Sequence, residues 1–202
     1  MSNAITKKFL ECRQQMDDKD DFFFTVAFLL APTIAAQKAA SLICFSQAKR
    51  DSLSLWQKYR GELLADTKLK YFEVSKIKNN LVVLFYQPDV LKKIIRQQAP
   101  CEFLQQFGYN TPINLKSYLE HLKRRYHHGC PPEIGLFLGI PVNDVISFIN
   151  NRGQNFIFSG YWKVYHDAER AKNIFAAYDR ARAKVLDLHA AGVNPCEIIK
   201  VI

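Results

Sequence analysis

The stretch YFEVSKIKNNLVVLFY, residues 71–86, decides the fold class because the period of the hydrophobic pattern changes there. In residues 71–77, apolar Phe72 and Val74 alternate with polar side chains, which is typical of a half-buried strand. After an asparagine-rich turn, residues 81–86 form a continuous β-branched and aromatic run, as in a strand that is covered on both faces. The stretch therefore predicts a β-hairpin.

Helical patterns surround this hairpin. Upstream, a buried apolar run is followed by an alanine-rich segment and an amphipathic one. Downstream, apolar residues recur at helical spacing, and one stretch, residues 156–165, alternates as a strand. The expected helices are 22–30 (helical or semi-extended), 32–45 with Pro32 in its first turn, one after a cap at Asp51, 88–98, 113–126, and one that begins after Asp167 and ends at Gly192.

Together these patterns predict an α+β protein in which mostly amphipathic helices pack on a small, mainly antiparallel sheet. The length of 202 residues favours a single globular domain, residues 1–202. Its N-terminal third, residues 1–66, is expected to be helical, and the remainder, residues 67–202, to be α+β. The sheet is expected to have about three strands, near residues 71–77, 81–86 and 156–165.

The cysteines and the apolar runs indicate the compartment. The chain has 5 cysteines, an odd number at wide spacings without a CxxC motif, which is typical of reduced thiols. The apolar run FFFTVAFLLA, residues 22–31, is too short to span a bilayer. It also follows an acidic segment, whereas a signal peptide has a basic one. We therefore expect a cytoplasmic protein without a membrane span.

The formal net charge of +9 is compatible with an anionic partner. The positive residues are scattered, however, and the cluster Lys123-Arg124-Arg125 is shorter than the blocks of like charge that mark nucleic-acid-binding tails. Non-specific nucleic-acid binding through this cluster is an alternative, while solvated faces explain the same charges without a partner.

Alternation along residues 156–165 divides the side chains between two faces. The apolar ones, with Trp162 among them, are expected in the core. Tyr161, Lys163 and Tyr165 fall on the opposite face, where two phenols and an ammonium suit an anionic or aromatic ligand. The alternative is that both tyrosines are amphipathic edge residues with their hydroxyls in water.

The cluster His127-His128-Gly129-Cys130 carries groups that ligate zinc or iron. A structural zinc site needs four protein ligands, and no second Cys/His pair has a suitable spacing, so the sequence predicts no metal site. Basic neighbours can activate a thiol, which makes Cys130 a candidate for thiol or redox chemistry. Alternatively, the histidines complement the dipole at the C-terminal end of the preceding helix.

Residues 131–151, PPEIGLFLGIPVNDVISFINN, predict two short helices and resemble a helix-turn-helix in outline. A DNA-reading second helix presents basic or amide groups to phosphates and bases. Here that helix has no lysine or arginine before Arg152, so an αα-hairpin in the core is the better interpretation. Sequence-specific DNA binding is not expected. Glu133 lies in the first turn of its helix, where the helix dipole explains it without catalysis.

Three segments carry a resemblance to a known family. PPEIGLFLGIPVNDVISFI (131–149) and SGYWKVY (159–165) resemble an uncharacterised bacterial family, the domain of unknown function 3793. APTIAAQKAASL (31–42) is similar to the family's Ala-Pro-Thr segment with its downstream lysine, here Lys38. The resemblance implies one fold and an intracellular setting, and it implies no substrate.

Two positions depart from the family pattern. Pro132 stands where the family has histidine, and Ser159 where it has cysteine. If those family residues form a metal or redox pair, this chain has lost it, which speaks against thiol or metal chemistry here.

The main hypothesis is a cytosolic binding module for a small anionic or aromatic ligand or for a protein partner. A thiol, redox or metal-dependent accessory enzyme that uses Cys130 is the less favoured alternative, and non-specific nucleic-acid binding is another. No nucleotide-binding, serine-hydrolase or zinc-protease motif is present, so the sequence identifies no cofactor. The predicted ligand-binding residues are Tyr161, Lys163, Tyr165, His127, His128, Glu133 and Lys38.

Overall fold

The computed structural model of the chain describes residues 3–48, 50–110 and 112–202. It contains a three-stranded antiparallel sheet in the order β1-β3-β2 and a separate two-stranded antiparallel sheet, β4-β5. The α+β class is therefore confirmed. The strands are β1 (Ala40–Ser46), β2 (Lys70–Ile77), β3 (Asn80–Tyr86), β4 (Phe158–Ser159) and β5 (Lys163–Val164).

Helices account for most of the remaining structure. They are α1 (Asn3–Cys12), α2 (Asp18–Ile34), α3 (Ser52–Leu64), α4 (Pro88–Ile95), α5 (Gln98–Gln105), α6 (Leu115–Tyr126), α7 (Ile134–Phe137), α8 (Val142–Asn150), α9 (Ala168–Ala190) and α10 (Pro195–Val201), with a 3-10 turn at Arg13–Gln15. Among the described residues, no helix combines the length and the apolar character that a membrane crossing requires.

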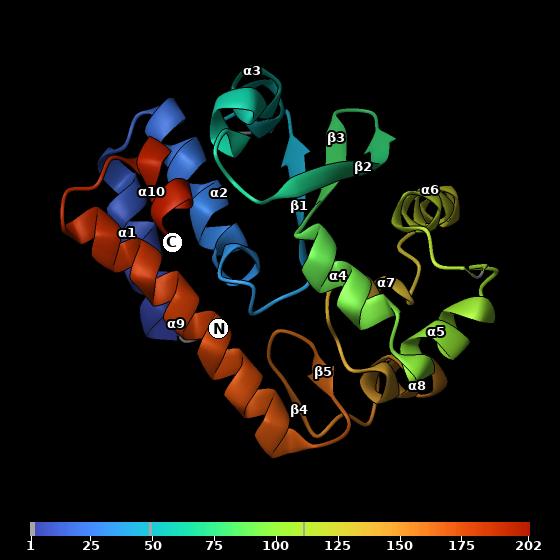
Figure 1. The fold of residues 1–202 in the computed structure, drawn as a ribbon. Helices are drawn as coiled ribbons and strands as arrows, with labels where there is room; N and C mark the ends of the chain where they lie inside the picture. The colour runs from blue at the N-terminus through green and yellow to red at the C-terminus, as the bar shows by residue number, and fades with distance from the viewer. Residues whose placement is uncertain (1–2, 49, 111) are drawn as a thin grey trace.

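The central strand β3 is covered on both faces, as predicted. Its side chains alternate between two cores: Leu81, Val83 and Phe85 belong to one, and Leu84 belongs to the other. Helices α2, α3, α9 and α10 contribute to the first core, and helices α4 to α8 to the second. Figure 1 shows the two groups of helices on either side of the sheet. The predicted hairpin is also confirmed, since β2 and β3 pair as neighbours across a tight turn.

The third strand of this sheet is β1 and not residues 156–165, and it lies in a segment that we expected to be helical. Helix α2 continues to Ile34, so Pro32 occupies its last turn rather than the first turn of a new helix. The chain reverses at Ala36, which has a φ of 53°, and β1 then pairs with β3 along its whole length. Alanine and leucine favour a helix in isolation, but pairing with β3 and burial decide for a strand here.

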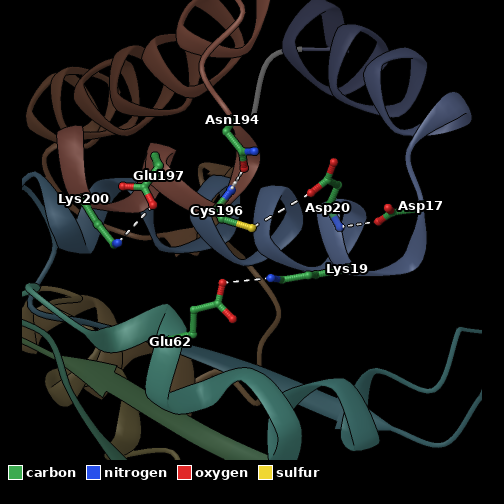
Figure 2. A network of polar contacts seen from close by, with 8 residues as sticks. All are labelled: Asp17, Lys19, Asp20, Glu62, Asn194, Cys196, Glu197 and Lys200. Carbon is green, nitrogen blue, oxygen red and sulfur yellow. Dashed lines mark hydrogen bonds and ion pairs between the residues drawn. The ribbon is translucent and has the colours of Figure 1, made fainter.

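The C-terminal helix α10 closes the first core against the N-terminal part of the chain. The Sγ of Cys196 lies 4.0 Å from Oδ1 of Asp20 in α2, and Figure 2 shows this contact together with its neighbours. Beside it, the Lys19 ammonium is 2.9 Å from the Glu62 carboxylate and joins α2 to α3. Asn194 caps α10 by accepting a hydrogen bond from the Cys196 N–H. Polar contacts thus hold both ends of the chain at one edge of the core.

The first core depends strongly on Trp56, which is fully buried in α3. Its ring is stacked 4.9 Å from that of Phe45 and lies 5.3 Å from that of Phe85, so it bridges the helix and two strands. We expect Trp56→Ala to lower the free energy of unfolding by about 3–5 kcal/mol, because a large cavity forms. Urea denaturation measures the change. Ile77→Ala, at a side chain that is 60% exposed, is the control and should cost under about 0.5 kcal/mol.

Candidate functional site

A cavity of about 820 Å³ lies between the α7–α8 pair and the β4–β5 hairpin. Its walls are mostly apolar: Ile134 and Leu138 face it from the α7 region, and Val145 and Ile149 from α8. The hairpin contributes the opposite wall through its turn, residues 159–163. Gly135 allows the two helices to approach, since a Cβ there would lie 2.8 Å from the Val145 side chain.

The hairpin arises because residues 156–165 fold back on themselves instead of forming the single strand that we predicted. The Gly160 N–H donates to the Trp162 carbonyl at 3.0 Å, which closes the turn. Gly160 is required by packing, because a Cβ there would lie only 2.2 Å from the Phe175 ring. The space that we expected Gly160 to leave for a ligand or a neighbouring backbone is therefore filled by a side chain. As a consequence Trp162 is buried, as predicted, while Phe156 is exposed.

Asp144, in the first turn of α8, connects the two walls. Its carboxylate accepts hydrogen bonds from the Trp162 indole N–H at 2.7 Å and from the backbone N–H groups of Tyr165 and His166 at 3.0 and 2.9 Å. The side chain is almost completely buried. One carboxylate thus orients the hairpin relative to α8, and both of its oxygens accept hydrogen bonds.

Two cations, Lys163 and Arg152, line the cavity. The Lys163 ammonium donates a hydrogen bond to the Gly153 carbonyl at 2.7 Å and lies 5.0 Å from the centre of the Phe156 ring. No ion pair involves either cation among the residues that the structure describes. With two cations and one carboxylate, Asp144, in its wall, the cavity carries a net positive formal charge.

Tyr161 also lines the cavity, but its hydroxyl points to α9. It donates to the Asp179 carboxylate at 2.6 Å and accepts from the Arg182 guanidinium at 3.0 Å. Burial, together with the bond to Asp179, raises the pKa of Tyr161 above its usual range. The phenol therefore anchors the hairpin to α9, and its hydroxyl is already engaged there.

Glu133 is fully buried and turns away from the cavity. Its carboxylate pairs with the Arg125 guanidinium from α6 through two hydrogen bonds, and the Tyr109 hydroxyl lies 3.5 Å away. Burial and the Glu133 charge raise the pKa of Tyr109, so its phenol stays neutral beside the ion pair. Loss of one partner of such a buried ion pair strongly destabilises a folded protein. The pairing with Arg125 therefore gives Glu133 a structural role that the helix dipole alone did not explain.

The His127–Cys130 segment is exposed, and its members differ in position. His127 and His128 are not part of the cavity wall, whereas Cys130 lines it. The Tyr126 hydroxyl donates to the Cys130 Sγ at 3.3 Å. In the described part of the chain, no group of three or more His, Cys, Asp or Glu side chains is arranged to hold a metal ion.

Tyr165 and Lys38 complete the predicted set, and neither lines the cavity. The Tyr165 hydroxyl is buried without a hydrogen-bond partner among the described residues. Lys38 lies against α9, with its ammonium 6.0 Å from the centre of the Tyr178 ring. The structure therefore brings together Tyr161, Lys163 and Cys130, and it separates the other predicted residues from them.

The sequence did not single out the apolar wall or Arg152 as parts of a site. Arg152 follows α8 with a φ of 51°, and no sequence signal placed it near residues eleven positions further on. Ile134, Leu138, Val145 and Ile149 read as ordinary core residues in a helical pattern. Only the position of the hairpin over α8 leaves their side chains as the wall of a cavity.

A sequence model of the family described as "Protein of unknown function (DUF3793)" matches residues 26–199, which is most of the chain. The match covers β1 to β5 and all of the residues that line the cavity. No curated protein and no solved structure matches the chain.

The role of Asp144 is open to a stability test. We expect Asp144→Ala to lower the free energy of unfolding by about 2–4 kcal/mol, because three donors lose their acceptor in a partly dry site. Asp144→Asn should cost less, since the amide oxygen still accepts two bonds while the amide N–H₂ opposes the Trp162 N–H. Denaturation with tryptophan fluorescence as the probe measures both. The exposed neighbour Asn143→Ala is the control, and an Asp144→Ala variant as stable as this control would contradict the role.

Proposed function

The chain belongs to the DUF3793 family, and because that membership names no activity we propose its function from the cavity. We propose that the protein is a binding module, and that the cavity between α7–α8 and the β4–β5 hairpin holds a small molecule with an apolar, aromatic body and an anionic group. The observation that carries the proposal is a large apolar cavity with two cations, Lys163 and Arg152, in its wall.

The size and lining of the cavity support an organic ligand of moderate size. Small-molecule sites typically occupy about 300–1,000 Å³ and combine an apolar wall with a few polar groups. The volume of about 820 Å³ falls in this range. The aliphatic side chains of α7 and α8 and the ring of Tyr161 offer flat and apolar contacts for an aromatic body.

The charges support an anionic group on that ligand. Lys163 and Arg152 bring two positive charges to the wall, and the one carboxylate in it, Asp144, is already fully hydrogen-bonded. An arginine can hold a carboxylate or a phosphate through two parallel hydrogen bonds. The Lys163 ammonium has donors beyond the one that it gives to Gly153, so a ligand oxygen can share it without displacing that contact.

A reducing compartment fits the five thiols, none of which forms a disulfide. We infer a cytoplasmic setting from this pattern, because exposed Cys44 and Cys130 would oxidise in a secreted protein. A bacterial origin agrees with the family resemblance.

One observation favours a second candidate function, thiol chemistry at Cys130. Its Sγ lies in the cavity wall and receives the Tyr126 hydroxyl, so a bound ligand would contact it. An enzyme that acts through this thiol would lose activity in Cys130→Ser, whereas a binding module would retain its affinity. This variant therefore separates the two functions.

Binding of the dye 8-anilinonaphthalene-1-sulfonate, an aromatic anion, tests the proposal. We expect fluorescence titration to show saturable binding at one site. Lys163→Met and Arg152→Asn should each weaken it at least about fivefold, which equals roughly 1 kcal/mol, because a charge-assisted contact is lost. Ile149→Trp places an indole in the cavity wall, narrows the space for the dye and should also weaken binding.

Two control variants make the same kinds of change, loss of a positive charge and gain of side-chain bulk, at positions outside the cavity. Lys93→Met removes an exposed lysine of α4, and Ile77→Trp adds the same bulk at an exposed position of β2. Both should bind the dye as the parent does. Dye binding that is unaffected by Ile149→Trp would place the dye elsewhere and refute the proposed site.

A further inference from the structure

Three charged side chains meet where the turn before α2 approaches the loop between β1 and α3. Asp21 of α2 is almost completely buried, and its carboxylate pairs with the guanidiniums of both Arg13 and Arg50. Arg13 donates from Nε to one carboxylate oxygen and from Nη2 to the other, the second bond at 2.9 Å. Two positive charges and one negative charge leave a net formal charge of +1 on this cluster.

The surrounding structure holds both guanidiniums in place. The Arg13 guanidinium also lies 5.1 Å from the centre of the Phe9 ring. Arg50 has a φ of 77°, a backbone conformation that is uncommon outside glycine and is concentrated at binding and switch sites. Burial alone would raise the pKa of Asp21, but the two arginines lower it below its usual range, so the carboxylate between them stays charged.

Both arginines line a hollow of about 360 Å³ together with Leu10 and Gln14. No acidic side chain is among the described residues of this lining, and Asp21 lies behind it. The Arg13 and Arg50 side chains are 28% and 38% exposed, whereas Asp21 is 6% exposed. A guanidinium has five N–H donors, and Asp21 takes those of Nε and Nη2 from Arg13, so donors on both arginines remain for an anion in the hollow.

Neighbouring carboxylates are directed elsewhere. Asp17 accepts a hydrogen bond from the Asp20 N–H, and the Asp20 carboxylate lies 4.0 Å from the Cys196 Sγ, as Figure 2 shows. The Glu11 carboxylate is 3.9 Å from the Lys7 ammonium. None of these acidic residues lines the hollow. The excess positive charge of the two arginines therefore faces a hollow whose described wall does not neutralise it.

We propose that this hollow binds a phosphate, either free or as the phosphoryl group of a small ester, between Arg13 and Arg50. A phosphate has enough oxygens to accept from both guanidiniums at once, and its charge offsets the repulsion between them. The Gln14 amide can donate a further hydrogen bond. The hollow shares no residue with the cavity between α7–α8 and the β4–β5 hairpin, so this site does not depend on the function proposed for that cavity.

Equilibrium dialysis with radiolabelled inorganic phosphate, in about 0.15 M sodium chloride, tests the proposal. We expect one phosphate per chain with a dissociation constant of about 1 mM or below. Arg50→Gln should weaken binding at least about fivefold, and it leaves Asp21 paired with Arg13. Arg60→Gln removes an exposed arginine that pairs with Glu73 and should bind as the parent does. An unchanged affinity in Arg50→Gln overturns the proposal.

A second pair of variants leaves the three charged side chains intact. Leu10 lines the hollow at a side chain that is 53% exposed, so its replacement opens no core cavity. Leu10→Glu places a carboxylate in the wall and should weaken phosphate binding at least about threefold relative to Leu10→Gln, which matches it in size. Equal affinities in these two variants place the phosphate elsewhere and contradict the site.

The source of the phosphate and the choice of cavity are decided in the same assay. Glycerol 3-phosphate that displaces the labelled ion at a similar concentration identifies a phosphate ester as the ligand, whereas failure to displace it identifies the free ion. Lys163→Met changes the other cavity and should leave phosphate binding unchanged. Loss of phosphate binding in Lys163→Met, with retention in Arg50→Gln, overturns this site and leaves the proposed binding module standing.

Discussion

Burial of β3 on both faces is the constraint on which the structure depends. A strand whose successive side chains enter two different cores needs helices on each side of the sheet. Leu81, Val83 and Phe85 share a core with α2, α3 and the C-terminal helices. Leu84 shares the other core with helices α4 to α8. The chain therefore crosses from one layer to the other after β3, and it returns through the β4–β5 hairpin and α9.

The cavity is a consequence of that return. Each strand of the hairpin is only two residues long, so the hairpin does not cover α8 as a full sheet would. Asp144 holds it at one side through Trp162, and Tyr161 holds it at the other through Asp179 and Arg182. Between these anchors lies the cavity, which apolar side chains of α7 and α8 line together with Lys163 and Arg152. Lys38 also lies against α9, with its ammonium 6.0 Å from the centre of the Tyr178 ring.

Several parts of the fold follow from local pattern alone. Asp51 and Asp167 cap α3 and α9 as expected, since short-range hydrogen bonds to the following backbone decide a helix start. The β2–β3 hairpin also needs only neighbouring residues. The segment 40–46 misled the prediction because its alanine and leucine have helical propensity, and only β3, forty residues later, supplies the hydrogen bonds that make it a strand. For residues 156–165, alternation identified Trp162 as buried, but the turn at Gly160 depends on Phe175 of α9.

For the site, residue type and position in the sequence pointed to Tyr161 and Lys163 as ligand-binding candidates and to Cys130 as a thiol candidate, and these three line the cavity, whereas the other predicted residues do not. It also determined the family, through PPEIGLFLGIPVNDVISFI and GYWKVY. Only the tertiary structure decided that Glu133 pairs with Arg125, that Arg152 joins Lys163, and that Lys38 loses its solvent next to Arg182. The physical reason is that burial and electrostatic environment depend on groups far away in the chain, whereas periodicity reports only what lies within a few residues.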